Sequence, residues 1–205
     1  MKRTQAIYLK LKEAYPDARC ELNYKTPFQL VVATLLSAQA TDKSVNAVTK
    51  TLFEKYPDVE SFLPLSMGEI ENEIRKIGLY KNKAKSIYNL CRELNSKFNG
   101  QVPKTMEELV TLSGVGRKTA SVVMAEGFKI PAFPVDTHIL RLASRLGMSK
   151  ATVADKVSDD IMKDLAKKYW INAHHVFIFH GRRTCIARNP KCEECVVKEY
   201  CKYIK

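Results

Sequence analysis

Four of the six cysteines fall within the last 21 residues, with the spacing C-x6-C-x2-C-x5-C. They are Cys185, Cys192, Cys195 and Cys201. In an intracellular chain, thiols clustered in this way bind metal and do not form disulfides. Zinc and iron–sulfur clusters both accept four thiolates, and this spacing has only one of the two C-x2-C pairs usual in a zinc ribbon. The spacing therefore predicts a metal centre and leaves its kind open.

A second candidate site is the segment L-S-G-V-G-R-K-T-A at residues 112–120, where a glycine-containing turn joins two predicted helices. Glycine lets the backbone approach a bulky anion closely, and amides of the turn and of the next helix then point at the same place. This geometry suits a DNA phosphate. The residues that would contact it are Gly114, Val115, Gly116 and Arg117. Glycine also occurs in many helix–helix turns for steric reasons alone.

Two residues near this turn could act in catalysis. Lys118 lies in the first turn of the helix after the glycines, and Asp136 begins a later helix in the segment V-D-T-H. The lysine could equally contact a phosphate, and the aspartate could cap its helix. A free lysine has a pKa of about 10.4, whereas a nucleophilic lysine needs one of roughly 7 to 8, a difference of about 4 kcal/mol. A helix N-terminus supplies at most ~2 kcal/mol, so desolvation or a neighbouring cation such as Arg117 must add to it.

Composition agrees with a polyanionic partner. Lys and Arg number 34 against 22 Asp and Glu, which gives a formal net charge of +12 in 205 residues. Such an excess is typical of proteins that bind nucleic acid, although a lysine-rich proteome would produce it too. The longest apolar run, near residues 30–36, is far shorter than the ~20 residues of a membrane span, and charged residues exclude a signal peptide. We therefore expect a cytoplasmic protein, associated with the nucleoid in a prokaryotic cell, that does not enter the membrane.

The elements that must position these residues are helices. Helical periodicity covers nearly the whole chain and strand signals are almost absent. Capping patterns begin at Thr26, Ser66 and Thr105. Helices are predicted at residues 30–36, 43–56, 82–98, from about 117, and at 137–146, 153–168 and 173–183. Two prolines in residues 129–134 interrupt the helices and predict a connector between two lobes.

Taken together, the motifs resemble those of the endonuclease III family of helix-hairpin-helix DNA glycosylases. L-x-G-V-G-R-K-T-A, V-D-T-H and the cysteine pattern occur in that order, and the similarity extends over the chain through L-L-S-A-Q-A-T-D at 35–42 and I-G-L-Y at 77–80. The resemblance implies an all-α fold with two helical lobes and a DNA-binding cleft between them. Residues 21–130 would form a barrel-like lobe with the helix-hairpin-helix, and residues 1–20 plus 131–205 the iron–sulfur cluster lobe.

The resemblance also implies an activity, base excision repair of DNA. The enzyme would remove oxidised pyrimidines of the thymine glycol type and cleave abasic sites by β-elimination through a Schiff base on Lys118, with Asp136 as the carboxylate partner. Its substrate would be damaged double-stranded DNA, and we expect it to act as a monomer. The two alternatives are a monofunctional thymine or uracil mismatch glycosylase and a non-catalytic iron–sulfur protein that binds DNA. Lys118 and the end of the chain shortly after Cys201 argue against the related adenine glycosylases.

Other residue roles follow from the same resemblance. The four cysteines would hold a [4Fe-4S] cluster, and Arg188 and Lys191 in its loop would face phosphate. Gln39 and Leu79 would fill the space left by a flipped base. On simpler interpretations Gln39 caps a helix and Leu79 belongs to the core. A DNA-facing loop is favoured by the cations around Leu79, which are Arg75, Lys76, Lys81, Lys83 and Lys85.

The remaining polar and sulfur residues are assigned to packing. Cys20 and Cys91 are expected to be buried without a role. The same applies to the histidines, which are His138, His174, His175 and His180. Ser113 stands where many family members have proline before the first hairpin glycine, and it is expected to loosen the turn slightly.

Overall fold

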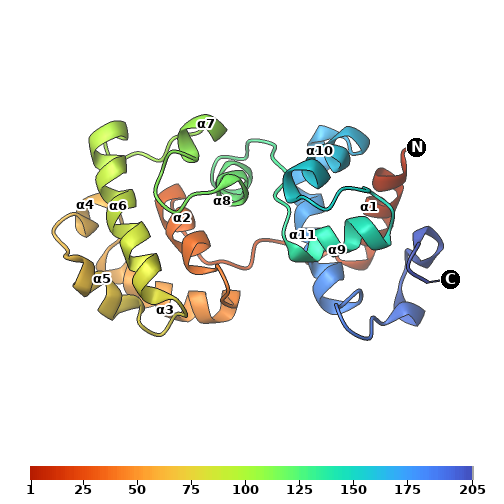
Figure 1. Cartoon of the computed structure of the whole chain (residues 1–205), viewed down its shortest axis with the longest axis horizontal. Helices are drawn as coiled ribbons and strands as arrows, with labels where there is room; N and C mark the ends of the chain where they lie inside the picture. The colour runs from red at the N-terminus through yellow and green to blue at the C-terminus, as the bar shows by residue number, and fades with distance from the viewer. Residues whose placement is uncertain (205) are drawn as a thin grey trace. The chain divides into compact units, whose positions relative to one another are not determined.

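The computed structural model describes residues 1–204, and the helices of that part are accompanied by no β-strand (Figure 1). The predicted all-α class is therefore confirmed. The chain divides into two compact units, one formed by Glu21–Ile130 and the other by Met1–Cys20 with Pro131–Lys205. No helix among residues 1–204 is both long and apolar enough to cross a membrane.

The Glu21–Ile130 unit is built around α2 (Pro27–Leu36). The Thr26 side chain caps this helix, and Pro27 occupies its first position, where no backbone N–H is needed. Every residue from Phe28 to Leu36 is buried. Burying each large aliphatic side chain here contributes roughly 1.5–3 kcal/mol. α2 contacts four neighbouring elements, which are α3 (Asp42–Lys55), α6 (Tyr80–Phe98), α8 (Arg117–Val122) and the π-helix η1 (Val123–Gly127).

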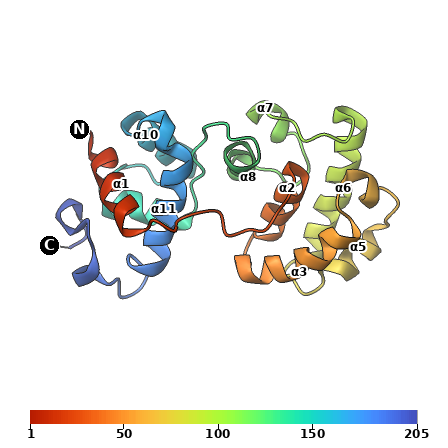
Figure 2. The same cartoon turned by 180° about the vertical axis from the view of Figure 1, so that it is seen from behind.

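Three short helices complete this unit (Figure 2): α4 (Val59–Phe62), α5 (Met67–Ile74) and α7 (Met106–Leu109). α5 begins with a reciprocal capping box between Ser66 and Glu69, as the sequence predicts. α6 turns one apolar face to α4 and α5, and its buried residues include Ala84, Ile87 and Leu94. This face fixes α6, whose N-cap is Leu79.

The other unit has four main helices: α1 (Arg3–Ala14), α9 (Thr137–Arg145), α10 (Ala154–Asp164) and α11 (Trp170–Arg183). α11 packs against both α1 and α9, and α1 also contacts α10. This unit also contains three short 3-10 helices. They are η2 (Lys167–Tyr169), between α10 and α11, and η3 (Cys192–Glu194) and η4 (Lys198–Tyr200), after α11. The last two lie in the cysteine-rich loop, which has no longer helix between Thr184 and Ile204.

Candidate active site and metal centre

The glycine turn joins α7 to α8 as the sequence predicts, and it is closed by a hydrogen bond from the Val115 amide to the Leu112 carbonyl of 3.0 Å. Gly114 has φ of +78°, a conformation that favours glycine. A Cβ atom at Gly114 would also lie 2.7 Å from Leu35 and 2.8 Å from Ser86. The first glycine is therefore required by the packing of the unit itself.

The second glycine has a different environment. Gly116 is the N-cap of α8 and has a negative φ of −88°, and a Cβ atom there would meet nothing within 4 Å. No side chain caps this helix. Because Gly116 has no side chain, the backbone at this position allows the close approach of an anion.

Lys118 and Arg117 are both exposed in the first turn of α8. The Glu21–Ile130 unit therefore does not remove water from the Lys118 ammonium by burial. Val115, by contrast, is buried in the core of the unit at 4% exposure. Any DNA contact of Val115 must therefore be made by its backbone, because its side chain packs inward.

Asp136 begins α9 in the other unit, where its Oδ1 accepts a hydrogen bond from the Ile139 amide at 2.8 Å. The capping role that the sequence offered as an alternative is thus present. It leaves the second carboxylate oxygen for other partners. The segment before Asp136 is non-helical, and its Pro134 carbonyl is hydrogen-bonded to His174 at 2.9 Å. These contacts orient the carboxylate within its own unit.

Gln39 and Leu79 both have left-handed backbone conformations that are unusual for non-glycine residues, with φ of 54° and 60°. Both side chains are exposed, Leu79 at 55%. The simpler interpretations of these two residues are therefore wrong, because Leu79 is not in the core and Thr41, not Gln39, caps α3. Strained, exposed residues of this kind occur most often where a protein meets its ligand.

The basic residues around Leu79 do not all face solvent. Arg75, Lys76, Lys81 and Lys85 are exposed, as a DNA-facing loop requires. Lys83 is buried at 6% exposure, so its expected place among the exposed cations is wrong. The helical register explains the difference, because Lys83 lies on the buried face of α6 beside Ala84.

Ser113 does not loosen the hairpin as expected. Its amide donates to Oε2 of Glu93 at 2.6 Å, and its hydroxyl donates to Oε1 of the same residue at 2.7 Å. Proline could not make the first of these bonds, because it has no N–H. Glu93 belongs to α6, so the serine ties the hairpin to the longest helix of the unit.

The four clustered cysteines line one common pocket after α11, with Arg145, Thr184 and Tyr203 among its other residues. Among residues 1–204, however, no three His, Cys, Asp or Glu side chains are close enough together to hold a metal ion. Four thiolates that line one pocket are a donor set that zinc and an iron–sulfur cluster both accept.

Two arginines of α9 hold the start of this loop. Arg141 donates to the carbonyls of Gly181 and Cys185 at 2.7 Å and 3.0–3.1 Å. Arg145 donates to the Cys185 sulfur at 3.4 Å and to the Ile186 carbonyl at 2.8 Å. The helix that begins at Asp136 is thus hydrogen-bonded to the cysteine loop.

Arg188 and Lys191 are exposed in the loop, as expected for phosphate contacts. The Lys191 ammonium lies 3.6 Å from a carboxylate oxygen of Glu194, which offsets part of its charge. Of the two predicted loop cations, Arg188 is therefore the stronger candidate.

The histidines are packing and hydrogen-bonding residues, as predicted. His174, His175 and His180 are buried, and His138 is half-buried against Arg141. Burial lowers the pKa of His180 to about 4. The Tyr15 hydroxyl is hydrogen-bonded to its Nδ1 at 3.0 Å.

The two cysteines outside the cluster motif differ in burial. Cys91 is fully buried, as expected, and this burial raises its pKa to about 12. Cys20 is only half-buried, so the expectation of a buried Cys20 is wrong.

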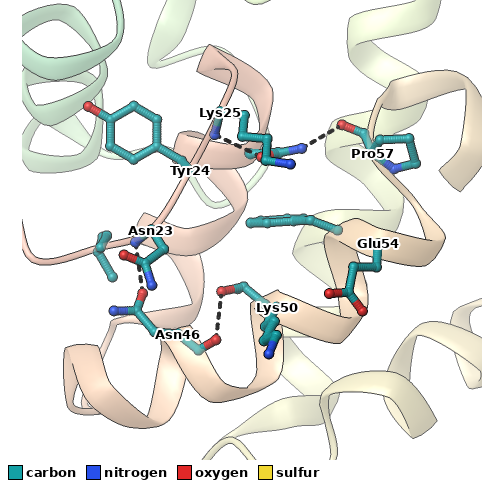
Figure 3. A pocket seen from close by; sticks show the side chains of 11 residues that line it. Asn23, Tyr24, Lys25, Asn46, Lys50, Glu54 and Pro57 are labelled. Carbon is teal, nitrogen blue, oxygen red and sulfur yellow. Dashed lines mark hydrogen bonds between the residues drawn. The ribbon is translucent and has the colours of Figure 1, made fainter.

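A pocket of the Glu21–Ile130 unit, with a volume of about 480 Å³, lies between the Leu22–Lys25 segment and α3 (Figure 3). None of the predicted site residues lines it. Its polar groups already bond to one another, with the Asn23 amide on Asn46 at 2.8 Å and the Gln29 side chain on Pro57 at 3.1 Å. This pocket is therefore separate from the candidate site.

Comparison with known proteins identifies the class. Residues 32–169 match the HhH-GPD superfamily of base excision DNA repair proteins. Residues 185–201 match the iron-sulfur binding domain of endonuclease III, so the cysteine loop is an iron–sulfur site.

The particular family follows from whole-chain similarity. Endonuclease III of Synechocystis is 48% identical over 97% of this chain and 91% of its own, and that of Bacillus subtilis is 44% identical over 98% and 93%. A solved trapped endonuclease III–DNA covalent intermediate has a TM-score of 0.93 and 43% identity, covering 97% of this chain and 93% of that one. This chain belongs to the endonuclease III family and is a base excision repair DNA glycosylase with abasic-site lyase activity.

Proposed function

We propose that the chain is a bifunctional enzyme that removes oxidised pyrimidines from double-stranded DNA, acts as a monomer, and cleaves the resulting abasic site by β-elimination. The observation that carries this proposal is the exposed Lys118 in the first turn of the helix after the hairpin. The second hairpin glycine, Gly116, has room for a Cβ atom within the protein, so packing does not require glycine there. A phosphate bound at the turn would bring the sugar of the damaged nucleotide to the amine.

In the proposed reaction, the lone pair of Lys118 Nζ attacks C1′ of the deoxyribose. The C1′–N bond breaks, and the base leaves with the bonding electrons and takes up a proton. Asp136 accepts the proton released by the amine and stabilises positive charge on the sugar. Displacement first gives an aminal in which C1′ is still bonded to O4′. The sugar ring then opens as the C1′–O4′ bond breaks and O4′ takes up a proton, and the product is an iminium between Lys118 and C1′.

The same iminium explains the lyase step. It acidifies the C2′ proton, and loss of that proton expels the 3′ phosphate with the electrons of the C3′–O bond. Hydrolysis of the Schiff base then releases the amine of Lys118. One nitrogen atom thus serves both base removal and strand cleavage.

The DNA contacts assigned to this reaction have two roles. The hairpin backbone from Gly114 to Arg117 and the loop cations Arg188 and Lys191 would bind phosphates and set the register on the duplex. Gln39 and Leu79 would occupy the space that the extruded nucleotide leaves, which offsets part of the cost of unstacking.

We also propose that the iron–sulfur site holds a [4Fe-4S] cluster through Cys185, Cys192, Cys195 and Cys201. When bound, the cluster supplies a covalent cross-link that fixes an otherwise irregular loop. The side chains of this unit do the rest, because Arg141 and Arg145 hold the loop to α9.

The cluster is tested by iron and sulfide analysis. We expect about four iron and four acid-labile sulfide ions per chain, together with a yellow-brown colour. Cys192→Ser should lower the iron content, whereas Cys20→Ser, at a cysteine outside the motif, should leave it unchanged. A colourless protein containing zinc would refute this assignment.

The reaction is tested with a duplex that carries one thymine glycol. Wild-type enzyme should release the base and nick the strand, whereas Lys118→Ala should do neither at a measurable rate. Asp136→Asn should slow base release by roughly 10²–10⁴-fold. Lys156→Ala, which removes an exposed lysine from α10, is the charge control. Base release by Lys118→Ala without nicking would favour the monofunctional glycosylase, and DNA binding without either product the non-catalytic protein.

A further inference from the structure

Lys83 is a buried lysine whose partners are backbone carbonyls. Its Nζ donates to the carbonyl of Leu36 at 2.9 Å and to that of Ala38 at 2.7 Å. These carbonyls lie at and just beyond the C-terminus of α2, which has no basic residue in its last turn. The ammonium therefore satisfies helix-end acceptors and offsets the negative end of the α2 dipole. Burial lowers the pKa of Lys83.

The same residue is bonded to two exposed loops. Ala38, which accepts from its side chain, directly precedes Gln39. The backbone N–H of Lys83 donates to the carbonyl of Leu79 at 3.1 Å. Gln39 and Leu79 are the two exposed residues of this region with left-handed backbones. This backbone bond is the first i→i−4 bond of α6, and the side-chain bonds of Lys83 to Leu36 and Ala38 tie that helix start to the loop that carries Gln39.

Lys83 has a folding role, because its ammonium caps the end of α2. A neutral side chain of similar length, such as methionine, would fill the space without taking a charge out of water, but it would leave the Leu36 and Ala38 carbonyls without this donor. The neighbouring Lys81 and Lys85 are exposed and keep their hydration. The two hydrogen bonds to the carbonyls of Leu36 and Ala38 require a long side chain with a donor at its end.

We propose that Lys83 is a positioning residue that holds the Gln39 and Leu79 loops at a fixed separation, so that both side chains enter the duplex together. This rests on the proposed function, in which these two side chains fill the space left by the damaged base. Lys83 acts from beneath the loops and not as a phosphate contact, because it is 6% exposed. If the two loops are held in place before DNA binds, no free energy is spent on ordering them during binding. The insertion of Gln39 and Leu79 into the duplex is then more favourable.

The test compares Lys83→Met with Lys97→Met, which removes an exposed charge from the last turn of the same helix. Single-turnover base release from a thymine glycol duplex is measured. Lys83→Met should lower the rate about tenfold or more, because small displacements of positioning groups have effects of that size. Lys97→Met should stay within about threefold of wild type. Equal rates for Lys83→Met and wild type would overturn the proposal.

Two further measurements separate positioning from a general effect on folding. The effects of Lys83→Met and Gln39→Ala on base release should be less than additive in free energy, because the lysine side chain acts through the loop that carries Gln39. A 2-aminopurine beside the lesion should show a smaller fluorescence rise with Lys83→Met. A variant that loses thermal stability but releases base normally, at temperatures where it is folded, would contradict positioning. Should Lys83→Met fail to fold, Lys83→Leu, which also lacks a donor and favours the helix, replaces it with the same expectations.

Failure of this proposal is distinguishable from failure of the proposed function. If Gln39→Ala and Leu79→Ala leave base release unchanged, the role assigned to these two loops is wrong. If both slow the reaction and Lys83→Met does not, the loops act as proposed and Lys83 is not their positioning residue.

Discussion

At the scale of single residues, the two hairpin glycines serve different needs. Gly114 is required by its positive φ and by Leu35 and Ser86, which leave no room for a Cβ atom. Gly116 has an ordinary φ and open space around it. Because the packing of the protein does not require glycine at position 116, we assign the need for glycine to the close approach of a ligand. We propose that this ligand is a DNA phosphate.

This difference predicts opposite phenotypes for two alanine variants. Gly114→Ala should lower the free energy of unfolding by about 2–4 kcal/mol, because it adds a strained backbone to a steric clash. Gly116→Ala should unfold at nearly the wild-type urea concentration and bind duplex DNA about tenfold more weakly, since a lost charge-assisted contact is worth ~1.5 kcal/mol or more. Normal DNA affinity of Gly116→Ala would show that phosphate does not approach this position.

Sequence patterns identified some residues and missed others for a physical reason. The cysteine spacing and the glycine turn are local, so they can be read directly from the sequence. The burial of Lys83 depends on which face α6 turns to α2, and the strain at Gln39 depends on how two helices meet. Such tertiary contacts leave no local signature.

At the scale of elements, the hairpin is attached to α6 through Ser113 and Glu93. Two hydrogen bonds from one serine to one carboxylate, at 2.6 Å and 2.7 Å, replace the backbone restriction that proline would impose. Proline at position 113 has no N–H and could not donate to Glu93. The attachment of the hairpin to α6 therefore depends on the serine and the glutamate together.

A double-mutant cycle tests this attachment. Glu93→Ala and Ser113→Ala should each destabilise the protein, and their coupling energy in urea unfolding should be about 1 kcal/mol, as expected for a half-exposed, charge-assisted bond. Glu107→Ala, at the exposed start of α7, serves as the control. Strict additivity of the two substitutions would mean that the bond does not stabilise the hairpin.

The helices themselves were largely predictable, because their starts carry local capping signals. Thr26, Ser66 and Thr105 cap α2, α5 and α7 as their sequence patterns indicate. The π-helix Val123–Gly127 was not predicted, since its residues have the same apolar periodicity as an α-helix. Its wider turn depends on packing against α2, which the sequence pattern does not reveal.

At the scale of the whole molecule, chemistry is divided between two compact units. The hairpin and Lys118 belong to Glu21–Ile130, and Asp136 and the cysteine loop belong to the other unit. Within that second unit, Arg141 and Arg145 join the helix that begins at Asp136 to the loop. The net charge of +12 favours association of the whole chain with DNA.

The central claim is that Lys118 forms a covalent bond to the sugar. The most direct measurement is trapping with borohydride, in which the enzyme is incubated with an oligonucleotide duplex containing thymine glycol and the products are resolved by denaturing electrophoresis and mass spectrometry. Wild type should give a stable protein–DNA adduct attached at Lys118, and Lys118→Ala should give none. No adduct with wild type, or an equal yield with Lys118→Ala, would contradict the assignment.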